Sequence, residues 1–256
     1  MKQSLGFIGG GRITKILLKA FENKDAKFDK VVVTDPNNEV LTKLKKSFPL
    51  IQTENASVAA EQDIVFISLH PPVIMDALES LKSNFKNDAV VISLAPKINL
   101  AKLSSKLPQV TKIVRLIPNA TSFINEGYNP ICFSSSMSGS EKKEILNLLN
   151  LCGKTFEVSE GKLESYAIMS AMLPTYFWFQ WNELAEIGQK IGLSEQESKD
   201  SINETIIASL NLLYKSGLKF GEVVDLIPVK PIGEHEPQIV EIYQSKLIGL
   251  FEKIKP

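Results

Sequence analysis

The sequence predicts an α/β fold, a doubly wound parallel sheet of the Rossmann type that is followed by an all-helical domain. Up to about residue 160, short runs rich in β-branched residues alternate with amphipathic helical patterns. This alternation is typical of a parallel sheet with right-handed crossovers. Beyond residue 160 only helical patterns follow, and a run of three glycines joins the first expected strand to the first expected helix. We therefore expect two domains, residues 1–159 and residues 160–256.

Five short apolar runs in the first half are expected to be buried strands, because each is bounded by turn formers or charged residues. They cover residues 5–9, 30–35, 63–69, 89–95 and 112–117. Two later runs, PICFSS and KTFEVS, are expected to add strands before the helical half. The helical run between these two is expected to take Ser140 as its N-cap and to end at Gly153.

The helical half contains four patterns with apolar residues at helical spacing. The first is interrupted by Pro174, which should kink or split the helix. The second begins at the candidate cap Ser194 and stops at Gly217, and a short third pattern and a long last one follow. Long apolar helices without strands would leave much apolar surface exposed in a monomer. This domain is therefore expected to form a homodimer or a larger homo-oligomer.

The composition is that of an ordinary globular protein. The 256 residues are 44% hydrophobic and include 29 basic and 29 acidic side chains. A net charge of zero gives no reason to expect nucleic acid or an anionic membrane as a partner. No apolar run is long enough to cross a bilayer, the start lacks a secretory segment, and only two cysteines occur. We therefore expect a cytoplasmic protein without disulfide bonds.

The segment GFIGGGRIT, residues 6–14, is the strongest local signal. Glycines between a strand and a helix permit a tight turn, and the helix N-terminus offers free N–H groups to a pyrophosphate. The candidate cofactor-binding residues in this segment are Gly9, Gly11, Arg12 and Ile13. Asp35 ends the next strand, where its carboxylate would meet an adenosine ribose and repel a 2′-phosphate, which favours NAD over NADP. The alternatives are a plain tight turn at the glycines and a strand-end turn residue at Asp35.

The order of motifs resembles the pyrroline-5-carboxylate reductase family over most of the chain. GFIGGGRIT is similar to that family's opening GFIGxGxMA, and DIVFISLHPPVIMDAL is similar to its DVVxLAVKPQxxxxVL. VVISLAPKINLAKL is similar to VISIAAGIxxxxL, VRLIPNATSFINEG to VRxMPNxPxxxxEG, and MSAMLPTYFWF to LSGSGPAYxFxF.

The resemblance implies a dinucleotide-binding domain followed by a helical dimerisation domain, and the reduction of a cyclic imine to proline by NADPH or NADH. A protonated C=N bond is already electrophilic, so the protein needs mainly to hold its carbon against the nicotinamide. Ser170 matches a position of the family's substrate pocket. At His70, a backbone contact with the cofactor is favoured over a side-chain role. The positions implied to contact the cofactor are Asn55, His70, Pro71, Ala95 and Asn119.

The loop before the last helix departs from the family pattern. Where the resemblance implies SPGGTT, this chain reads KPIGEH over residues 230–235, so both threonines and one glycine are missing. Lys230 and Gly233 are candidate substrate contacts. Glu234 or His235 is a candidate catalytic residue that would pair with the protonated imine or donate a proton. The competing interpretation is a solvated loop. No metal is expected, because contiguous side chains in an extended loop point apart.

Three functions compete. The leading one is an NAD(P)H-dependent reductase of a cyclic imine, acting on a small imine or amino acid. The second is a β-hydroxyacid dehydrogenase, which shares the two-domain plan but relies on a lysine that is missing between residues 164 and 189. The third is a cofactor-binding regulatory homologue without reductase activity, which the altered loop favours.

Overall fold

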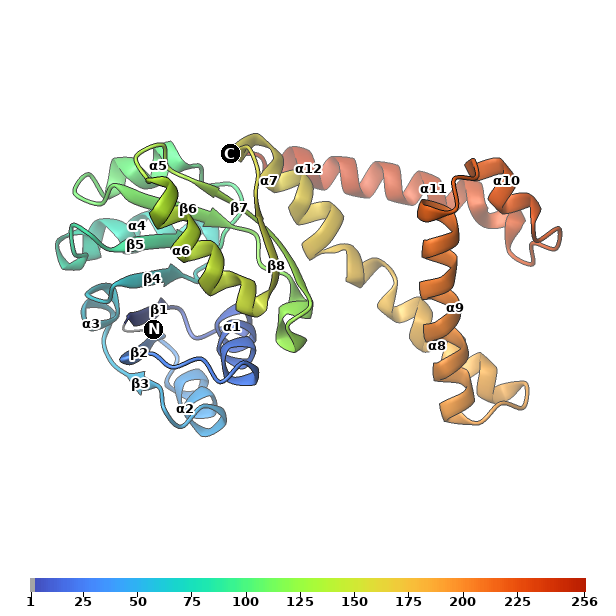
Figure 1. The fold of residues 1–256 in the computed structure, drawn as a ribbon, viewed down its shortest axis with the longest axis horizontal. Helices are drawn as coiled ribbons and strands as arrows, with labels where there is room; N and C mark the ends of the chain where they lie inside the picture. The colour runs from blue at the N-terminus through green and yellow to red at the C-terminus, as the bar shows by residue number, and fades with distance from the viewer. Residues whose placement is uncertain (1–2) are drawn as a thin grey trace. The chain divides into compact units, whose positions relative to one another are not determined.

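The computed structural model describes residues 3–256, and the chain forms two compact units. The first unit comprises the residues up to Ala171 together with Phe251–Pro256, and the second comprises Met172–Leu250. Strands and helices alternate in the first unit, whereas the second contains helices alone (Figure 1). The predicted class, a Rossmann-type sheet followed by a helical region, is confirmed. The predicted boundary between residues 159 and 160 falls after the last strand, inside the first unit.

The first unit is built on an eight-stranded sheet with the order β3-β2-β1-β4-β5-β6-β7-β8. Each predicted strand is present to within a few residues, except that the late strand PICFSS begins earlier than expected. No pattern in the sequence predicts β3, which consists of two exposed polar residues. The strands are β1 (Ser4–Ile8), β2 (Lys30–Thr34), β3 (Gln52–Thr53), β4 (Ile64–Ile67), β5 (Val90–Ser93), β6 (Lys112–Leu116), β7 (Gly127–Phe133) and β8 (Gly153–Glu157).

The direction of β7 departs from the expectation of a fully parallel sheet. The strands from β3 to β6 are parallel, but β7 runs antiparallel to β6 and parallel to β8. The connection from β6 to β7, residues 117–126, is shorter than the dozen or so residues that a parallel crossover needs. The chain therefore turns back through the short 3-10 helix η2 (Ala120–Ile124).

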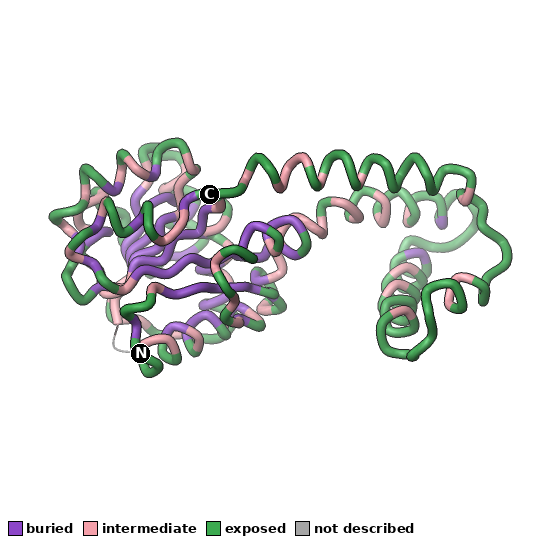
Figure 2. The backbone as a smooth tube through the Cα atoms, turned by 90° about the horizontal axis from the view of Figure 1, so that it is seen from above, coloured by how far each residue is buried: buried purple, intermediate pink, exposed green. Residues whose placement is uncertain are grey.

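Helices cover both faces of the sheet and bury two apolar clusters. One face carries α1 (Arg12–Asn23), α2 (Asn38–Ser47) and α6 (Gly139–Leu149). The other carries α3 (Ala56–Ala60), α4 (Pro71–Leu81) and α5 (Leu100–Lys106). Buried residues concentrate along the strands between these helices, as Figure 2 shows. The sheet is thus a rigid platform whose strand ends can position a site.

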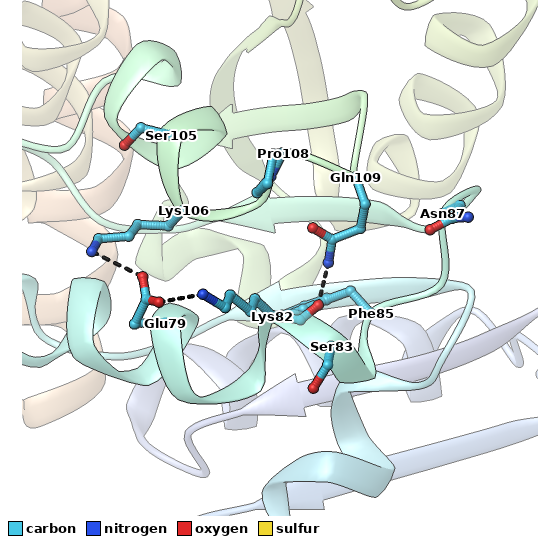
Figure 3. Close-up of a pocket in the computed structure, with 9 residues that line it drawn as sticks. All are labelled: Glu79, Lys82, Ser83, Phe85, Asn87, Ser105, Lys106, Pro108 and Gln109. Carbon is cyan, nitrogen blue, oxygen red and sulfur yellow. Dashed lines mark hydrogen bonds and ion pairs between the residues drawn. The ribbon is translucent and has the colours of Figure 1, made fainter.

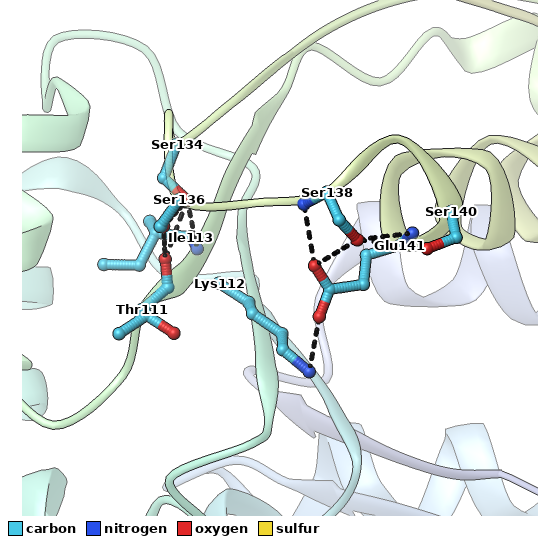
Figure 4. Close-up of polar contacts among 8 residues, drawn as sticks. All are labelled: Thr111, Lys112, Ile113, Ser134, Ser136, Ser138, Ser140 and Glu141. Carbon is cyan, nitrogen blue, oxygen red and sulfur yellow. Dashed lines mark hydrogen bonds and ion pairs between the residues drawn. The ribbon is translucent and has the colours of Figure 1, made fainter.

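The start of α6 corrects the prediction that Ser140 is its N-cap. Ser138 is the cap, and it forms a capping box with Glu141 (Figure 4). The Ser138 N–H and hydroxyl donate to Oε2 of Glu141 at 2.8 and 2.7 Å, and the Glu141 N–H donates back to the hydroxyl. The other carboxylate oxygen of Glu141 lies 2.9 Å from Nζ of Lys112 on β6. The spacing of Ser138 and Glu141 is the local pattern of a capping box, whereas Ser140 has Lys143 three residues later, so the sequence itself distinguishes the two serines.

Stability should depend on pH through Glu141. The hydrogen bond from Lys112, followed by those from the Ser138 N–H and hydroxyl, lowers the pKa of the Glu141 carboxyl from its ordinary value of 4.5 to about 2. Because the folded-state pKa is depressed, the stabilisation is complete above pH 4.5 and is lost as the pH falls toward 2. Urea unfolding of Glu141→Gln should therefore show a deficit relative to wild type at pH 6 that disappears near pH 2. Glu144→Gln, at an exposed position of the same helix, should show no such pH-dependent deficit.

The first unit ends in a broken helical run. After the 3-10 helix η4 (Glu160–Lys162), α7 (Leu163–Tyr166) passes into a π-helical turn, η5 (Ala167–Ala171). The second unit resumes with the 3-10 helix η6 (Leu173–Tyr176) and α8 (Trp178–Lys190). The predicted interruption at Pro174 is confirmed, since no regular α-helix passes through this residue.

The rest of the second unit follows the predicted helical patterns. Ser194 caps α9 (Glu195–Lys215) with a capping box, and Gly217 follows the helix in a left-handed conformation with φ of 83°. The short α10 (Phe220–Asp225), the 3-10 turn η7 (Gly233–His235) and α11 (Glu236–Tyr243) come next. The π-helix η8 (Gln244–Ile248) leads into α12 (Gly249–Ile254). None of the helices within residues 3–256 is both long enough and apolar enough to cross a membrane.

Candidate functional site

The glycine turn after β1 has a conformation that demands glycine. Gly9 has a φ of 109°, and its N–H donates to the carbonyl of Thr34 on β2 at 2.8 Å. A Cβ at this position would lie 2.5 Å from the carbonyl oxygen of Ser68. The backbone that follows β4 therefore closes the space around the turn. The buried hydroxyl of Thr14 donates to the Gly9 carbonyl at 2.6 Å and fixes the turn to the first helical turn of α1.

Gly11 caps α1 and faces open space. A Cβ at Gly11 would meet no atom within 4 Å, in contrast to Gly9. The first N–H groups of a helix have no partner within the helix, and the helix dipole favours an anion there. The cradle at the head of α1, which includes Arg12 and Ile13, therefore fits a pyrophosphate.

Asp35 lies directly against this turn. One carboxylate oxygen accepts the N–H of Gly10 at 2.8 Å, and the other accepts the N–H of Asn37 at 2.8 Å. The side chain therefore ties the end of β2 both to the glycine turn and to the start of α2. These two hydrogen bonds agree with the interpretation of Asp35 as a turn residue at the end of a strand. Each oxygen still has a lone pair for a ribose hydroxyl, so the two interpretations of Asp35 are compatible.

Three further predicted cofactor positions follow the carboxyl ends of β3, β4 and β5. Asn55 follows β3 and caps α3, with its side-chain oxygen accepting the Val58 N–H at 3.1 Å. His70 follows β4 and precedes Pro71, the first residue of α4, and its exposed side chain makes no capping bond. Ala95 follows β5 and is buried. Parallel strands present their carboxyl ends at one edge, so these residues share that edge with the glycine turn, where open α/β sheets bind ligands.

Asn119 and Ser170 form a buried junction in the first unit. The Asn119 amide donates to the carbonyl of Ser170 at 3.1 Å, and its side-chain oxygen accepts the Thr121 N–H at 3.1 Å. Pro174 lacks the N–H that would normally bond to the carbonyl four residues earlier, which is that of Ser170. The Asn119 side chain thus donates a hydrogen bond to the Ser170 carbonyl, which would otherwise lack its N–H donor because residue 174 is proline. The Ser170 hydroxyl is also engaged, since it donates to the Tyr166 carbonyl at 2.9 Å.

A buried charge cluster lies at the same edge, and none of its residues is among the predicted site residues. Arg115 on β6 is fully buried and forms ion pairs with Glu160, at 3.0 Å, and with Glu164. Glu164 accepts the N–H of Lys97 at 3.2 Å, and Glu160 accepts the N–H of Leu100 at 2.6 Å. The cluster therefore fixes the loop between β5 and α5. The sequence indicates this cluster only through the spacing of Glu160 and Glu164, which places both side chains on one face of a helical run.

The loop with the candidate catalytic residues lies in the second unit and is exposed. The N–H of Gly233 donates to the Lys230 carbonyl at 3.0 Å, which closes a tight turn. The His235 and Glu234 side chains lie 3.5 Å apart and are 57% and 81% exposed. Among residues 3–256, no group of three or more His, Cys, Asp or Glu side chains could hold a metal ion.

A surface cavity of about 350 Å³ lies at the other end of the strands from the glycine turn, near the amino ends of β5 and β6 (Figure 3). Glu79 bridges its two lysines, with its oxygens 2.5 Å from Lys82 and 3.0 Å from Lys106. The Gln109 amide donates to the Lys82 carbonyl. The cavity is separate from the predicted cofactor positions, and its lysines are already paired with a carboxylate.

Comparison with known proteins agrees with this geometry. Residues 4–97 match the family of NADP oxidoreductases described as coenzyme F420-dependent. The pyrroline-5-carboxylate reductase of Corynebacterium melassecola is 23% identical over 252 residues, which cover 97% of this chain and 93% of that relative. The enzyme of that name from Mycobacterium tuberculosis is 26% identical over 218 residues, covering 82% of this chain and 74% of that relative. The chain resembles pyrroline-5-carboxylate reductases over almost its whole length.

Solved structures of pyrroline-5-carboxylate reductases have the same fold. The Streptococcus pyogenes structure superposes with a TM-score of 0.78 at 20% identity, covering 99% of this chain and 96% of that one. The Plasmodium falciparum structure, which has NADP bound, gives 0.77 at 22% identity, covering 98% and 95%. The resemblance indicated by the motifs is confirmed, as is the expected class of an NAD(P)-dependent oxidoreductase similar to pyrroline-5-carboxylate reductase.

Proposed function

We propose that this chain reduces a cyclic imine with NADH or NADPH, in a reaction that resembles the conversion of 1-pyrroline-5-carboxylate to proline. The observation that carries the proposal is the glycine turn at the head of α1, with Gly11 open to a ligand and Asp35 bonded to the turn. The resemblance to pyrroline-5-carboxylate reductases over 97% of the chain supports the choice of an imine as substrate.

In this proposal the residues of the chain mainly bind and orient. Gly9, Gly11 and the N–H groups at Arg12 and Ile13 would hold the pyrophosphate, and Asp35 and Asn55 would hold the adenosine end. The cofactor supplies the hydride, which adds to the carbon of a protonated C=N bond to give an amine. The residues that would surround the nicotinamide end of the cofactor are His70, Pro71, Ala95, Asn119 and Ser170. Asn119 and Ser170 would contribute only shape, because their polar side-chain groups are already hydrogen-bonded within the protein.

The preferred cofactor is proposed to be NADH. A 2′-phosphate next to the ribose would approach the Asp35 carboxylate, and like charges at short range repel. Steady-state assays with both cofactors should give a lower KM for NADH than for NADPH. Asp35→Asn should narrow that difference, and an unchanged ratio of the two KM values would argue against this role of Asp35.

Glu234 and His235 are proposed to act on the imine, with Lys230 and Gly233 holding the substrate. Turnover by Glu234→Gln and His235→Ala should then fall about 10- to 100-fold with little change in the KM for NADH. Glu241→Gln, at an exposed position of α11, is the matched control. Near-wild-type turnover in both variants would favour the solvated-loop interpretation.

A cofactor-binding regulatory homologue is the second candidate, because the loop at residues 230–235 has lost the threonines that the family resemblance implies. The deciding measurement is oxidation of NADH and NADPH with 1-pyrroline-5-carboxylate and a small panel of cyclic imines. Cofactor binding without turnover of any imine would support the regulatory homologue.

The second unit is proposed to form a homodimer interface. Its helices expose many large apolar side chains. Figure 2 shows long stretches of the tube in these helices coloured as exposed. A groove of about 620 Å³ between α8 and α9 is lined by Trp178, Trp181 and several isoleucines. Sedimentation equilibrium should detect a dimer, and a monomer at micromolar concentration would contradict it. The exposed residues include Ile207, Leu210, Tyr214, Leu218, Phe220 and Val240.

A further inference from the structure

Two buried hydroxyl oxygens lie at the carboxyl ends of β4 and β5, and neither has a hydrogen-bond partner among residues 3–256. Ser93 is the last residue of β5 and is fully buried, whereas Ser68 directly follows β4. A buried donor without a partner costs free energy, so such groups are rare in folded proteins. One that lies at a ligand-binding edge can instead find its partner in the ligand.

Ser68 lies on the face of the sheet that α1 covers. Along β4, Phe66 belongs to the apolar cluster on the α1 face and stacks on Phe7 of β1, whereas Ile67 belongs to the cluster on the opposite face. Because side chains alternate between the two faces of a strand, the Ser68 side chain follows that of Phe66. Ser93 pairs with Ile67 across β4 and β5 and therefore lies on the other face.

The Ser68 side chain also lies beside the glycine turn. The Ser68 N–H donates to the carbonyl of Ile8 at 2.8 Å, which extends the pairing of β1 with β4. A Cβ at Gly9 would lie 3.3 Å from the Cβ of Ser68, so this side chain begins next to the turn. Alanine stands at this position in the family motif that residues 63–78 resemble, so the hydroxyl is a feature of this chain.

The order of the strands indicates which part of a dinucleotide Ser68 would meet. Asp35 follows β2, on one side of β1, where it would hold the adenosine ribose. Ser68 follows β4, on the other side of β1, and the pyrophosphate cradle lies between the two at the head of α1. A dinucleotide that lies across this edge therefore brings the ribose phosphate of its nicotinamide half next to Ser68.

We propose that the Ser68 hydroxyl binds the nicotinamide-side ribose phosphate of the cofactor. The inference rests on the cofactor site of the proposed function and adds a contact to it. The Ser68 residue is only half-buried, so rotation of its side chain to another staggered rotamer can turn the hydroxyl from the inside of the protein toward the open side of the turn. A phosphate or ribose oxygen then supplies the acceptor that the described residues do not.

The test measures the binding of the cofactor and of its fragments by calorimetric titration. Ser68→Ala should raise the Kd for NADH about 5- to 10-fold, and the Kd for NADPH by the same factor, because the 2′-phosphate lies in the adenosine half. ADP-ribose, which keeps the second ribose phosphate, should show the same loss. AMP, which lacks it, should bind the variant as it binds wild type. Ser93→Ala, which removes the hydroxyl on the opposite face, is the control and should leave these Kd values unchanged.

Thermal unfolding separates a cofactor contact from a structural role of Ser68. Alanine removes a hydroxyl that has no partner in the free protein, so Ser68→Ala should not lower Tm without cofactor. The rise in Tm at a fixed NADH concentration should be smaller than in wild type, because the variant binds NADH more weakly. A lower Tm of the cofactor-free variant would assign the hydroxyl a structural role and overturn the proposal.

The binding data can reject this contact without rejecting the proposed function. An unchanged Kd for NADH in Ser68→Ala, an equal loss for AMP, or an equal loss in Ser93→Ala would overturn the contact alone. Wild-type protein that binds neither NADH nor ADP-ribose would overturn the contact together with the proposed cofactor site. Cofactor binding that depends on Ser68, without turnover of any imine, would reject the proposed reaction and keep the contact.

Discussion

Gly11→Asp should abolish cofactor binding and leave the fold intact. A Cβ at Gly11 meets no atom within 4 Å, and the residue has an ordinary φ of −71°. An aspartate is therefore accommodated by the free protein, but its carboxylate occupies the space in which a pyrophosphate would meet the head of α1. Steric exclusion and like-charge repulsion should raise the Kd for NADH at least ~100-fold.

The measurements are fluorescence titration with NADH and thermal unfolding without cofactor. Gly139→Asp is the matched control, because Gly139 also begins a helix and its Cβ would also meet no atom within 4 Å. It should bind NADH as wild type does. Tight NADH binding by Gly11→Asp would remove the main support for the proposed cofactor site.

Arg115→Met should lower the free energy of unfolding by about 3–5 kcal/mol, because it leaves the carboxylate of Glu164 buried without its charged partner. Glu164 is only 2% exposed, so water cannot replace the guanidinium at that side chain. The loss should appear in urea unfolding at neutral pH as a lower midpoint.

The double variant Arg115→Met with Glu164→Gln should recover a large part of this loss, since it no longer buries an unpaired charge. Lys86→Met, which breaks the exposed ion pair with Asp63, should cost no more than about 1 kcal/mol. An Arg115→Met variant as stable as the Lys86→Met variant would show that the buried cluster is not a stabilising element of the first unit.

The stability of this cluster also bears on the site. It links β6 to the start of the C-terminal helical run and to the loop that carries Lys97. A substitution that loosens it should therefore disturb the loop between β5 and α5 as well as lower stability.

Much of the candidate site could be predicted from the sequence, because its signals are local. The glycine turn follows from three glycines between a strand pattern and a helix pattern, and Gly9 has the positive φ that such a turn demands. Asp35 follows from the end of the next strand. The helix caps at Ser194 and Gly217 likewise depend on residues a few positions apart. The cap at Ser138 also has a local signal, since Glu141 three residues later completes the capping-box spacing, whereas Ser140 has Lys143 there.

Periodicity and contacts within a few residues account for the alternation of strands and helices, the glycine turn and the helical C-terminal part, so these features can be predicted from the sequence. Three contacts are visible only in the folded chain. Arg115 pairs with Glu160 and Glu164. The Asn119 side chain donates to the Ser170 carbonyl, and Lys97, which has a left-handed conformation, donates its N–H to Glu164. These contacts join residues far apart in the chain. Their partners are chosen by how the packed sheet brings strand ends together, and no local pattern encodes that choice.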